Sequence, residues 1–251
     1  METAAGIIVL FLLFAIPLAF FAGIVVLIVM VIKRQRRLQA ERQGQMATVA
    51  RQMGATFQHS PPQSYADMLS QFKFYRSGLF GRQGSISDLF ELQRGGISWM
   101  IFDYTYREKQ GGTVSDSASD NMSNYFTRYS TVAAAELPPG KLPDFVLFRG
   151  RPGLLEKLLG EAIGIEDDVF EQTYTLESDD AQRAVGLFTP EVIASFTEDP
   201  MIKAMKDMIV ESDGRRFVLY KSGDAVVPAD RGAFVVQAEA IVDMLTAGGR
   251  T

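Results

Sequence analysis

The chain of 251 residues contains no cysteine, and this absence excludes a disulfide scaffold and a zinc–thiolate site. A single histidine, His59, also excludes the familiar multi-histidine metal sites and argues against catalysis through histidine. A hydrophobic content of 47% excludes a mostly disordered chain, and its excess belongs to one segment, which excludes a polytopic membrane protein. From these absences we expect neither a metal site nor a cofactor.

Charge is absent from residues 3–32, and 26 of these 30 residues are hydrophobic. A helix over residues 6–32 would be about 40 Å long, more than the hydrocarbon core of about 30 Å. Pro17 is tolerated in a transmembrane helix. A cleavable signal peptide fits less well, because the apolar stretch is too long and the amino end carries Glu2 instead of basic residues. We therefore predict a retained transmembrane anchor over residues 1–33.

Four basic residues, Lys33, Arg34, Arg36 and Arg37, follow this segment directly. Positive flanks of a membrane span stay in the cytoplasm. We therefore expect a single-pass protein of a bacterial inner (plasma) membrane, with the amino terminus outside and the domain in the cytoplasm. The same side chains could also bind anionic headgroups of the bilayer, although a topology signal alone is the simpler interpretation.

Small residues recur in the predicted anchor at Ala15, Ala19 and Gly23. This small-xxx-small spacing would allow two helices to approach closely, so it is a candidate packing face for a homo-oligomer. Alanine and glycine are common in membrane helices, and the spacing also fits a monomer.

The two parts of the chain differ in charge. Residues 1–55 carry six Lys/Arg and two Asp/Glu, whereas the remaining residues carry nineteen and twenty-eight. Because phosphate contact needs a basic surface, the acidic part is a poor candidate for binding nucleic acid. We predict a helical juxtamembrane stalk over residues 34–54, ended by Gly54, and a cytoplasmic domain over residues 55–251.

Alternating patterns and turn residues predict an α+β domain with a largely antiparallel sheet and with helices concentrated in the carboxy-terminal half. A Gly-Gly pair at residues 95–96 is a hairpin signal. Strands are expected at residues 72–75, 87–94, 97–107, 125–137, 145–149, 170–176 and 216–220. Helices are expected at residues 65–71, 152–159, 190–196, 201–208 and 230–245.

Three short motifs, Ser70-x-x-Lys73, Ser119-Asp-Asn and Lys221-Ser-Gly, occur in the order found in penicillin-binding serine acyltransferases and class A β-lactamases. The resemblance implies that Ser70 is the nucleophile, Lys73 its activator, Ser119 a proton shuttle and Lys221 the substrate-carboxylate ligand. Against it, the residues after Lys73 predict a strand and a turn instead of a long helix. The predicted topology also places the domain away from the cell wall.

An aromatic run contains Trp99 and Tyr104 on either side of Asp103, and the three residues are the binding candidates of the sequence. A buried strand packed by rings explains the aromatic residues, whereas a carboxylate at this position is exposed, paired or functional. The acidic clusters at residues 166–168, 179–180 and 198–199 lack the spacing of a calcium loop. Asp179 or Asp180 is interpreted as an amino-terminal helix cap, and the other two clusters as solvated turns.

The segments QMGATFQ, FKFYRSGLFGRQG, WMIFDYTY and DDVFEQTYTLESDDAQRAVGLFTPEVIASF occur in an order that resembles a family of bacterial membrane-tethered proteins with a domain of unknown function. The resemblance covers most of residues 50–245 and implies a single amino-terminal anchor with an α+β domain. It supplies no activity and no site residues.

Together these patterns predict a membrane-anchored cytoplasmic binding or scaffold module with a protein partner. Two alternatives stay open: an enzyme, either the serine acyltransferase or a carboxylate-based hydrolase, and a purely structural oligomer organised by the anchor. A deep pocket lined by Asp103 and another titrating group would favour the enzyme, whereas a shallow, aromatic-filled sheet would favour binding.

Overall fold

The computed structural model describes residues 2–62, 64–72, 84–109, 125–150, 162–205, 208–223 and 225–248. It describes the side chains of these residues except those of residues 2–23, 66, 107–109, 125, 126, 128, 222 and 223. The chain divides into two compact units, residues 1–45 and residues 46–251.

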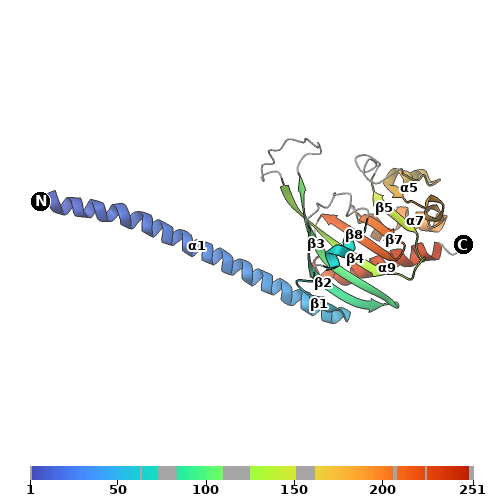
Figure 1. Cartoon of the computed structure of the whole chain (residues 1–251), viewed down its shortest axis with the longest axis horizontal. Coiled ribbons are helices and arrows are strands. Elements are labelled where there is room, and N and C mark those ends of the chain that lie inside the picture. Colours follow the sequence, from blue (N-terminus) through green and yellow to red (C-terminus); the bar gives the residue numbers. More distant parts are fainter. Residues whose placement is uncertain are drawn as a thin grey trace. The chain divides into compact units, whose positions relative to one another are not determined.

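Helices and strands alternate irregularly along the chain (Figure 1). The strands are β1 (Thr56–Gln58), β2 (Ser85–Arg94), β3 (Ile97–Lys109), β4 (Tyr125–Glu136), β5 (Asp144–Arg149), β6 (Tyr174–Glu177), β7 (Met208–Asp213) and β8 (Arg216–Gly223). The helices are α1 (Glu2–Met53), α2 (Ser64–Leu69), α5 (Asp168–Thr173), α6 (Ala181–Val185), α7 (Pro190–Glu198), α8 (Pro200–Lys203), the 3₁₀ turn η2 (Pro228–Asp230) and α9 (Arg231–Gly248).

The eight strands form one antiparallel sheet in the order β1-β2-β3-β4-β8-β7-β5-β6. The predicted hairpin between β2 and β3 is confirmed, with Arg94 opposite Ile97. Both turn residues, Gly95 and Gly96, have positive φ angles of 58° and 76°, which glycine adopts without strain. The expected fold class, α+β with an antiparallel sheet and helices in the carboxy-terminal half, is therefore confirmed.

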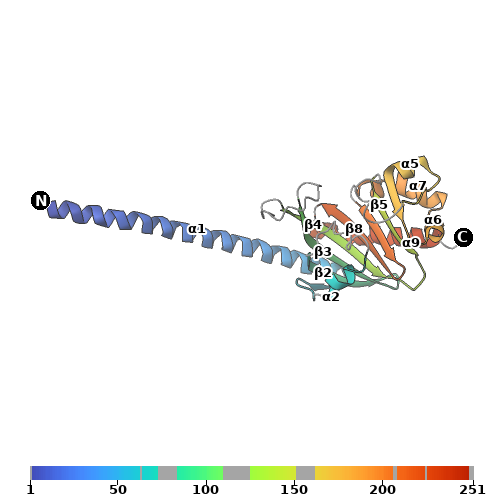
Figure 2. The same ribbon diagram turned by 45° about the horizontal axis from the view of Figure 1, so that its top comes forward.

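Side chains alternate between the two faces of the sheet, and each face has its own core. The first, which we call the α9 face, packs against α9, α7 and α5. The second, the α2 face, packs against α2, which is the only described helix that contributes to its core. Figures 1 and 2 show the sheet from two directions; α9 is labelled in both and α2 in Figure 2. The strand residues of the α9 face include Phe90, Leu92, Trp99, Ile101, Ala133, Ala135, Phe217 and Leu219. Those of the α2 face are Leu89, Met100, Phe102, Tyr104, Tyr106, Val132, Ala134, Val146, Phe148, Ile209, Val218 and Tyr220.

The last turns of α1 belong to the domain unit. Met46 and Ala50 are buried in the core of the α9 face, and Val49 and Met53 pack against it. The helix ends as the sequence predicts, because Gly54 takes a positive φ of 68° and the amide of Ala55 donates to the carbonyl of Ala50. A helical continuation through residues 33–53 is therefore confirmed.

Two expected elements are wrong. Residues 170–173, predicted as the start of a strand, are helical in α5, because Asp167 caps the amide of Phe170 at 2.8 Å and the strand begins only at Tyr174. The expected helix over residues 201–208 ends at Lys203, and β7 was missed. Pairing of β7 between β5 and β8 overrides the local helix propensity. The strand expected at 72–75 and the helix at 152–159 fall largely or wholly outside the described residues.

Within the described part of the chain, no helix is both long enough and apolar enough to cross a membrane. Much of the predicted span, residues 6–23, and its candidate packing residues Ala15, Ala19 and Gly23 lie outside the described side chains.

Candidate functional site

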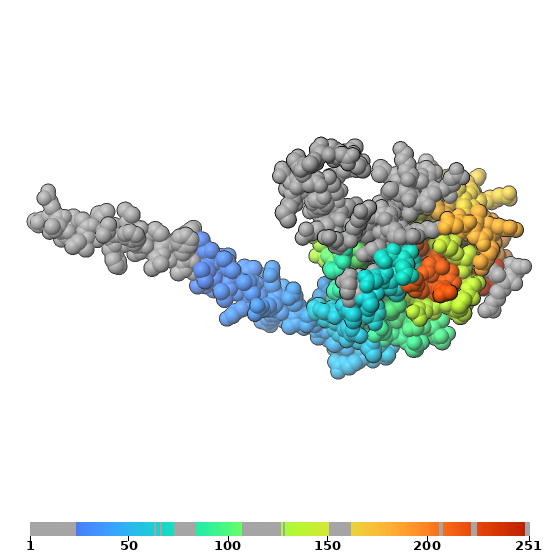
Figure 3. Space-filling view, in the orientation of Figure 1, coloured from blue at the N-terminus to red at the C-terminus, as the bar shows by residue number. Residues whose placement is uncertain are grey.

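The described part of α1 begins with an apolar run followed by a basic cluster (blue in Figure 3). All nine side chains of residues 24–32 are aliphatic or methionine, and they are 39–64% exposed. Lys33, Arg34, Arg36 and Arg37 follow and are exposed as well, with the Nε of Arg37 paired to the Oε1 of Glu41 at 2.8 Å. Because nine consecutive positions cover every side of a helix, this segment is apolar all round.

A buried ion pair lies between the sheet and the start of α9. Arg231 is fully buried, and its Nη2 lies 2.5 Å from the Oδ1 of Asp103 on β3. The Thr131 hydroxyl donates to the same carboxylate oxygen at 2.9 Å and accepts the amide of Val226 at 2.8 Å. The guanidinium also lies over the ring of Phe90, 4.8 Å from its centroid. These contacts compensate the cost of burying both charges, so the pair joins β3, β4 and α9 within the core.

Next to this pair, β2 contains a bulge that binds His59. The pairing of β2 with β3 shifts register between Ser87 and Phe90, and Asp88 takes a positive φ of 53°. The buried carboxylate of Asp88 lies 2.6 Å from the Nδ1 of the half-exposed His59, and the carbonyl of Asp88 accepts Nη1 of Arg231 at 3.1 Å. The bulge therefore connects the segment after β1 to the Arg231 network. His59 is an exposed residue whose Nδ1 faces the Asp88 carboxylate.

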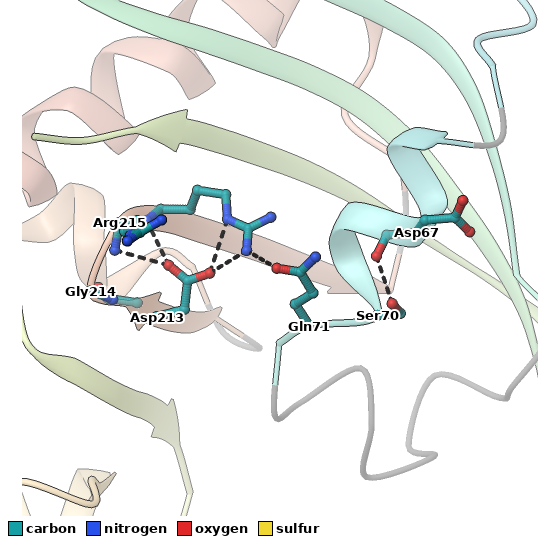
Figure 4. Close-up of polar contacts among 8 residues, drawn as sticks. Asp67, Ser70, Gln71, Asp213, Gly214 and Arg215 are labelled. Carbon is teal, nitrogen blue, oxygen red and sulfur yellow. Dashed lines mark hydrogen bonds and ion pairs between the residues drawn. The ribbon is translucent and has the colours of Figure 1, made fainter. Parts of the chain in front are cut away.

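On the opposite face, polar contacts fasten α2 at both ends. The Tyr65 hydroxyl donates to Oε1 of Glu91 on β2 at 2.6 Å. This hydrogen bond, aided by partial burial and the carboxylate charge, raises the pKa of Tyr65 above its ordinary value. At the other end, the guanidinium of Arg216 on β8 donates to the side-chain oxygen of Gln71 (Figure 4). Leu69 at the end of α2 and Phe72 directly after Gln71 are both fully buried.

Arg216 is itself held by the turn between β7 and β8. The carboxylate of Asp213 accepts the Nε and Nη2 of Arg216 at 2.9 and 2.6 Å and the amides of Arg215 and Arg216 at 3.0 and 2.7 Å. Figure 4 shows this carboxylate beside Gln71 at the end of α2. The guanidinium carbon also lies 5.4 Å from the ring centroid of Phe72. The turn therefore presents a fixed cation to the carboxyl end of α2.

The predicted binding residues do not share one surface. Trp99 and Asp103 lie on the α9 face, and Tyr104 lies on the α2 face, where its ring contacts the site of Gly84 so closely that a Cβ there would be 1.9 Å from Cζ. All three are buried.

Of the acyltransferase candidates, Ser70 is exposed at the end of α2, where its hydroxyl donates to the carbonyl of Asp67 at 2.6 Å. Lys221 is exposed on β8. Lys73 and Ser119 lie outside the described residues.

Acidic residues gather on the small helices of the carboxy-terminal half, and three of them are helix caps. The carboxylates of Asp167, Asp180 and Asp199 accept the amides of Phe170, Arg183 and Met201 at 2.8, 3.2 and 2.7 Å. The predicted cap at residues 179–180 is confirmed by Asp180, whereas Asp167 and Asp199, which were interpreted as solvated turns, are caps as well. A cavity beside α5 is lined by Gly164, Ile165, Glu166, Asp167, Asp168 and Glu171. Among the described residues, no group of three or more His, Cys, Asp or Glu side chains could hold a metal ion.

Comparison of the chain with protein-family models, with curated proteins and with solved structures found no match. The resemblance to the family of membrane-tethered proteins therefore stays a prediction.

Sequence reasoning missed Arg231, Asp88 and Arg216, which make the main polar contacts of the two faces. Arg231 has a weak signal, since it is a charged residue directly before the apolar stripe of the last helix. Asp88 carries no local signal, because its partners His59 and Arg231 come from other parts of the chain. Arg216 has a local partner in Asp213, but its contact with Gln71 joins distant parts of the chain.

Proposed function

We propose that the chain is a single-pass protein of a bacterial inner membrane, with its amino terminus outside and an α+β domain that binds a partner protein on the cytoplasmic side. The observation that carries this proposal is the run of nine exposed apolar residues, 24–32, directly followed by four exposed basic residues.

A helix that is apolar on every side is stable either inside a protein core or inside a bilayer. Side chains exposed to 39–64% are not in a core of this chain, so the bilayer is the environment that fits them. The sequence continues the uncharged stretch back to Thr3, which makes it long enough to span. Lys33, Arg34, Arg36 and Arg37 support the cytoplasmic placement of the domain through the positive-inside rule.

Two features favour binding over catalysis. Asp103, the best carboxylate candidate of the sequence, is committed to the ion pair with the fully buried Arg231 and to the Thr131 hydroxyl. The strands around it fill both faces of the sheet with aromatic and aliphatic side chains, including the fully buried Trp99, Phe102 and Tyr104. These are the features of a packed sheet and not of a catalytic cleft lined by titrating groups.

The membrane placement is tested with two reporters fused after Thr251, one that is active only in the cytoplasm and one that is active only outside it. We expect the cytoplasmic reporter to be active and the fusion to stay in the membrane fraction after alkaline carbonate washing. Deleting residues 6–32 should release the fusion to the soluble fraction. An active outside reporter, or a full chain in the soluble fraction, would overturn the proposal.

Partner binding is tested by crosslinking in cells with the full chain and with a matched control in which residues 1–54 carry an unrelated soluble domain. We expect a protein that is crosslinked to the full chain and absent from the control. If the two chains capture the same proteins, the domain does not bind the partner and this half of the proposal is wrong.

A further inference from the structure

Helix α2 lies on the sheet in the way that a helical peptide ligand occupies a groove. Tyr65 and Leu69 of α2 stand at positions i and i+4, which is the spacing of anchors on one helix face, and Phe72 packs against the same cluster from the turn that follows the helix. Leu69 and Phe72 are fully buried, and Tyr65 and Met68 pack against the same cluster. In Figure 3 the cyan side chains of this region lie at the surface of the molecule.

The strands beneath α2 provide an apolar platform with a polar residue at either end. Glu91, Met100, Ala134 and Val218 are neighbours in one row across β2, β3, β4 and β8. Glu91 binds the Tyr65 end of α2, and Arg216, two residues before Val218 on the same face, binds the Gln71 end. The small side chain of Ala134 in the middle of the row lets a helix approach the sheet closely.

Helix α2 is a short element to lie on a core. A six-residue helix is too short to be stable on its own. Its departure breaks no strand pairing, because none of its residues takes part in the sheet. Among the described residues, its contacts with the sheet are the buried Leu69, the packing of Tyr65 and Met68 and the Tyr65–Glu91 hydrogen bond, and Gln71 and Phe72 hold the turn after it.

We propose that α2 is a built-in competitor for an amphipathic helix of the partner protein, which docks on the β2–β3–β4–β8 platform when α2 leaves it. The partner helix carries large apolar residues at i and i+4, as Tyr65 and Leu69 stand in α2, followed by a further apolar residue in the place of Phe72. It places a hydrogen-bond donor next to Glu91 and an acceptor next to Arg216, as α2 does now. The inference rests on the proposed function, because it names the class of partner that the domain binds.

The test uses the full chain in detergent micelles and a fluorescein-labelled peptide of residues 61–72, whose sequence is PPQSYADMLSQF. Binding is measured by fluorescence anisotropy to the wild type and to the double variant Tyr65→Phe, Gln71→Ala. Loss of the two side-chain hydrogen bonds should raise the fraction of molecules with α2 open by about tenfold or more. The apparent affinity for the peptide rises by the same factor, since it scales with the competent fraction.

Two controls decide the result. A peptide in which Leu69→Asp and Phe72→Asp remove the anchors should not bind either protein. Hydrogen exchange should show α2 amides exchanging faster than those of β3 and β4 in the wild type, and faster still in the double variant, while β3 and β4 stay unchanged. Equal affinity of the two proteins for the peptide, binding of the control peptide, or α2 amides as slow as those of β3 would overturn the inference.

Failure of this inference is distinguishable from failure of the proposed function. A chain in the membrane fraction that captures its partner but does not bind the peptide leaves the proposed function intact. A chain that binds the peptide but is found in the soluble fraction contradicts only the membrane placement.

Discussion

The two faces of the sheet are both apolar, yet their helical covers differ in length and in how they are fixed. The α9 face is packed by an 18-residue helix with nine buried positions, by the end of α1 and by three capped short helices. Among the described helices, only the six-residue α2 contributes to the core of the α2 face.

The ion pairs of the two faces also differ in how deeply they are buried. On the α9 face, Arg231 is fully buried and its partner Asp103 is 3% exposed, so the pair belongs to the core. On the α2 face, both Arg216 and Asp213 are 19% exposed and lie at the rim. We therefore expect the α9 face to contribute more to the stability of the domain than the α2 face, as the proposed exchange of α2 requires.

The largest expected effect comes from breaking the buried pair. Arg231→Met leaves the Asp103 carboxylate buried without its cation, and we expect the free energy of unfolding to fall by about 3–5 kcal/mol. The matched variant at the rim of the α2 face, Arg216→Met, should lower the free energy of unfolding by about 1 kcal/mol or less, because its partner Asp213 stays hydrated. Urea unfolding of the full chain in detergent measures both.

A variant that removes both charges of the Arg231–Asp103 pair is the control for this prediction. The double variant Arg231→Met, Asp103→Leu removes both charges, so it should recover a large part of the loss. If Arg231→Met and Arg216→Met cost the same, the two faces do not differ in the way their charges are used.

The second prediction compares two leucines that are both fully buried, Leu245 of α9 and Leu69 of α2. Leu245→Ala should lower the global free energy of unfolding by about 2–5 kcal/mol, as expected for a cavity in a close-packed core. Leu69→Ala should cost about 1 kcal/mol globally, because the chain can lose α2 and keep the rest of its fold.

Hydrogen exchange separates these two outcomes by location. Leu69→Ala should speed exchange in α2 alone, whereas Leu245→Ala should speed it in β3, β4 and β8 together. Exchange that rises in β3 and β4 for both variants would mean that α2 is as integral to the core as α9.

Sequence patterns predicted the elements whose signal is local. The strands at β3 and β4 follow from alternation and from the turn at Gly95 and Gly96, and α9 follows from an apolar stripe with helical spacing. The helix predicted over residues 201–208 reached the first residue of β7, and residues 209–213 were assigned to no element before the turn at Ser212; pairing with β5 and β8 makes this segment a strand.

The candidate site was less accessible to sequence reasoning for a related reason. Asp103 was singled out as a carboxylate within an aromatic run, but its partner Arg231 comes from the far end of the chain. The importance of α2 depends on Glu91 and Arg216, which belong to strands at different places in the sheet. Spacing in the sequence holds no information on such contacts.

A third prediction concerns the caps that fix the helices of the α9 face. Asp199 ends α7 and begins α8, where its carboxylate accepts the amides of Met201 and Ile202 at 2.7 and 3.4 Å. Asp199→Ala should lower the free energy of unfolding by about 1 kcal/mol. Asp199→Asn keeps a capping oxygen and should cost clearly less. Equal losses for alanine and asparagine would show that the cap does not hold these helices.

The smallest expected effect is the pH dependence of the Tyr65 end of α2. The bond to Glu91 raises the pKa of Tyr65, so the neutral tyrosine is favoured in the folded state. This stabilisation, about 1 kcal/mol for one hydrogen bond, is therefore present below pH 10 and is lost as the pH rises through the folded pKa. Tyr65→Phe lacks the bond, and its melting temperature should lie below that of the wild type at pH 8.

Above the folded pKa the order of the two melting temperatures should reverse, because a tyrosinate beside the Glu91 carboxylate is repelled whereas phenylalanine is not. Thermal melts of the two proteins between pH 8 and pH 11.5 measure this crossing, and the double variant Tyr65→Phe, Glu91→Gln shows what the other tyrosines contribute. If the difference in melting temperature between wild type and Tyr65→Phe stays constant from pH 8 to pH 11.5, Tyr65 is not bonded to Glu91 in solution. The amino end of α2 would then be free already, and the two faces would differ even more than the structure indicates.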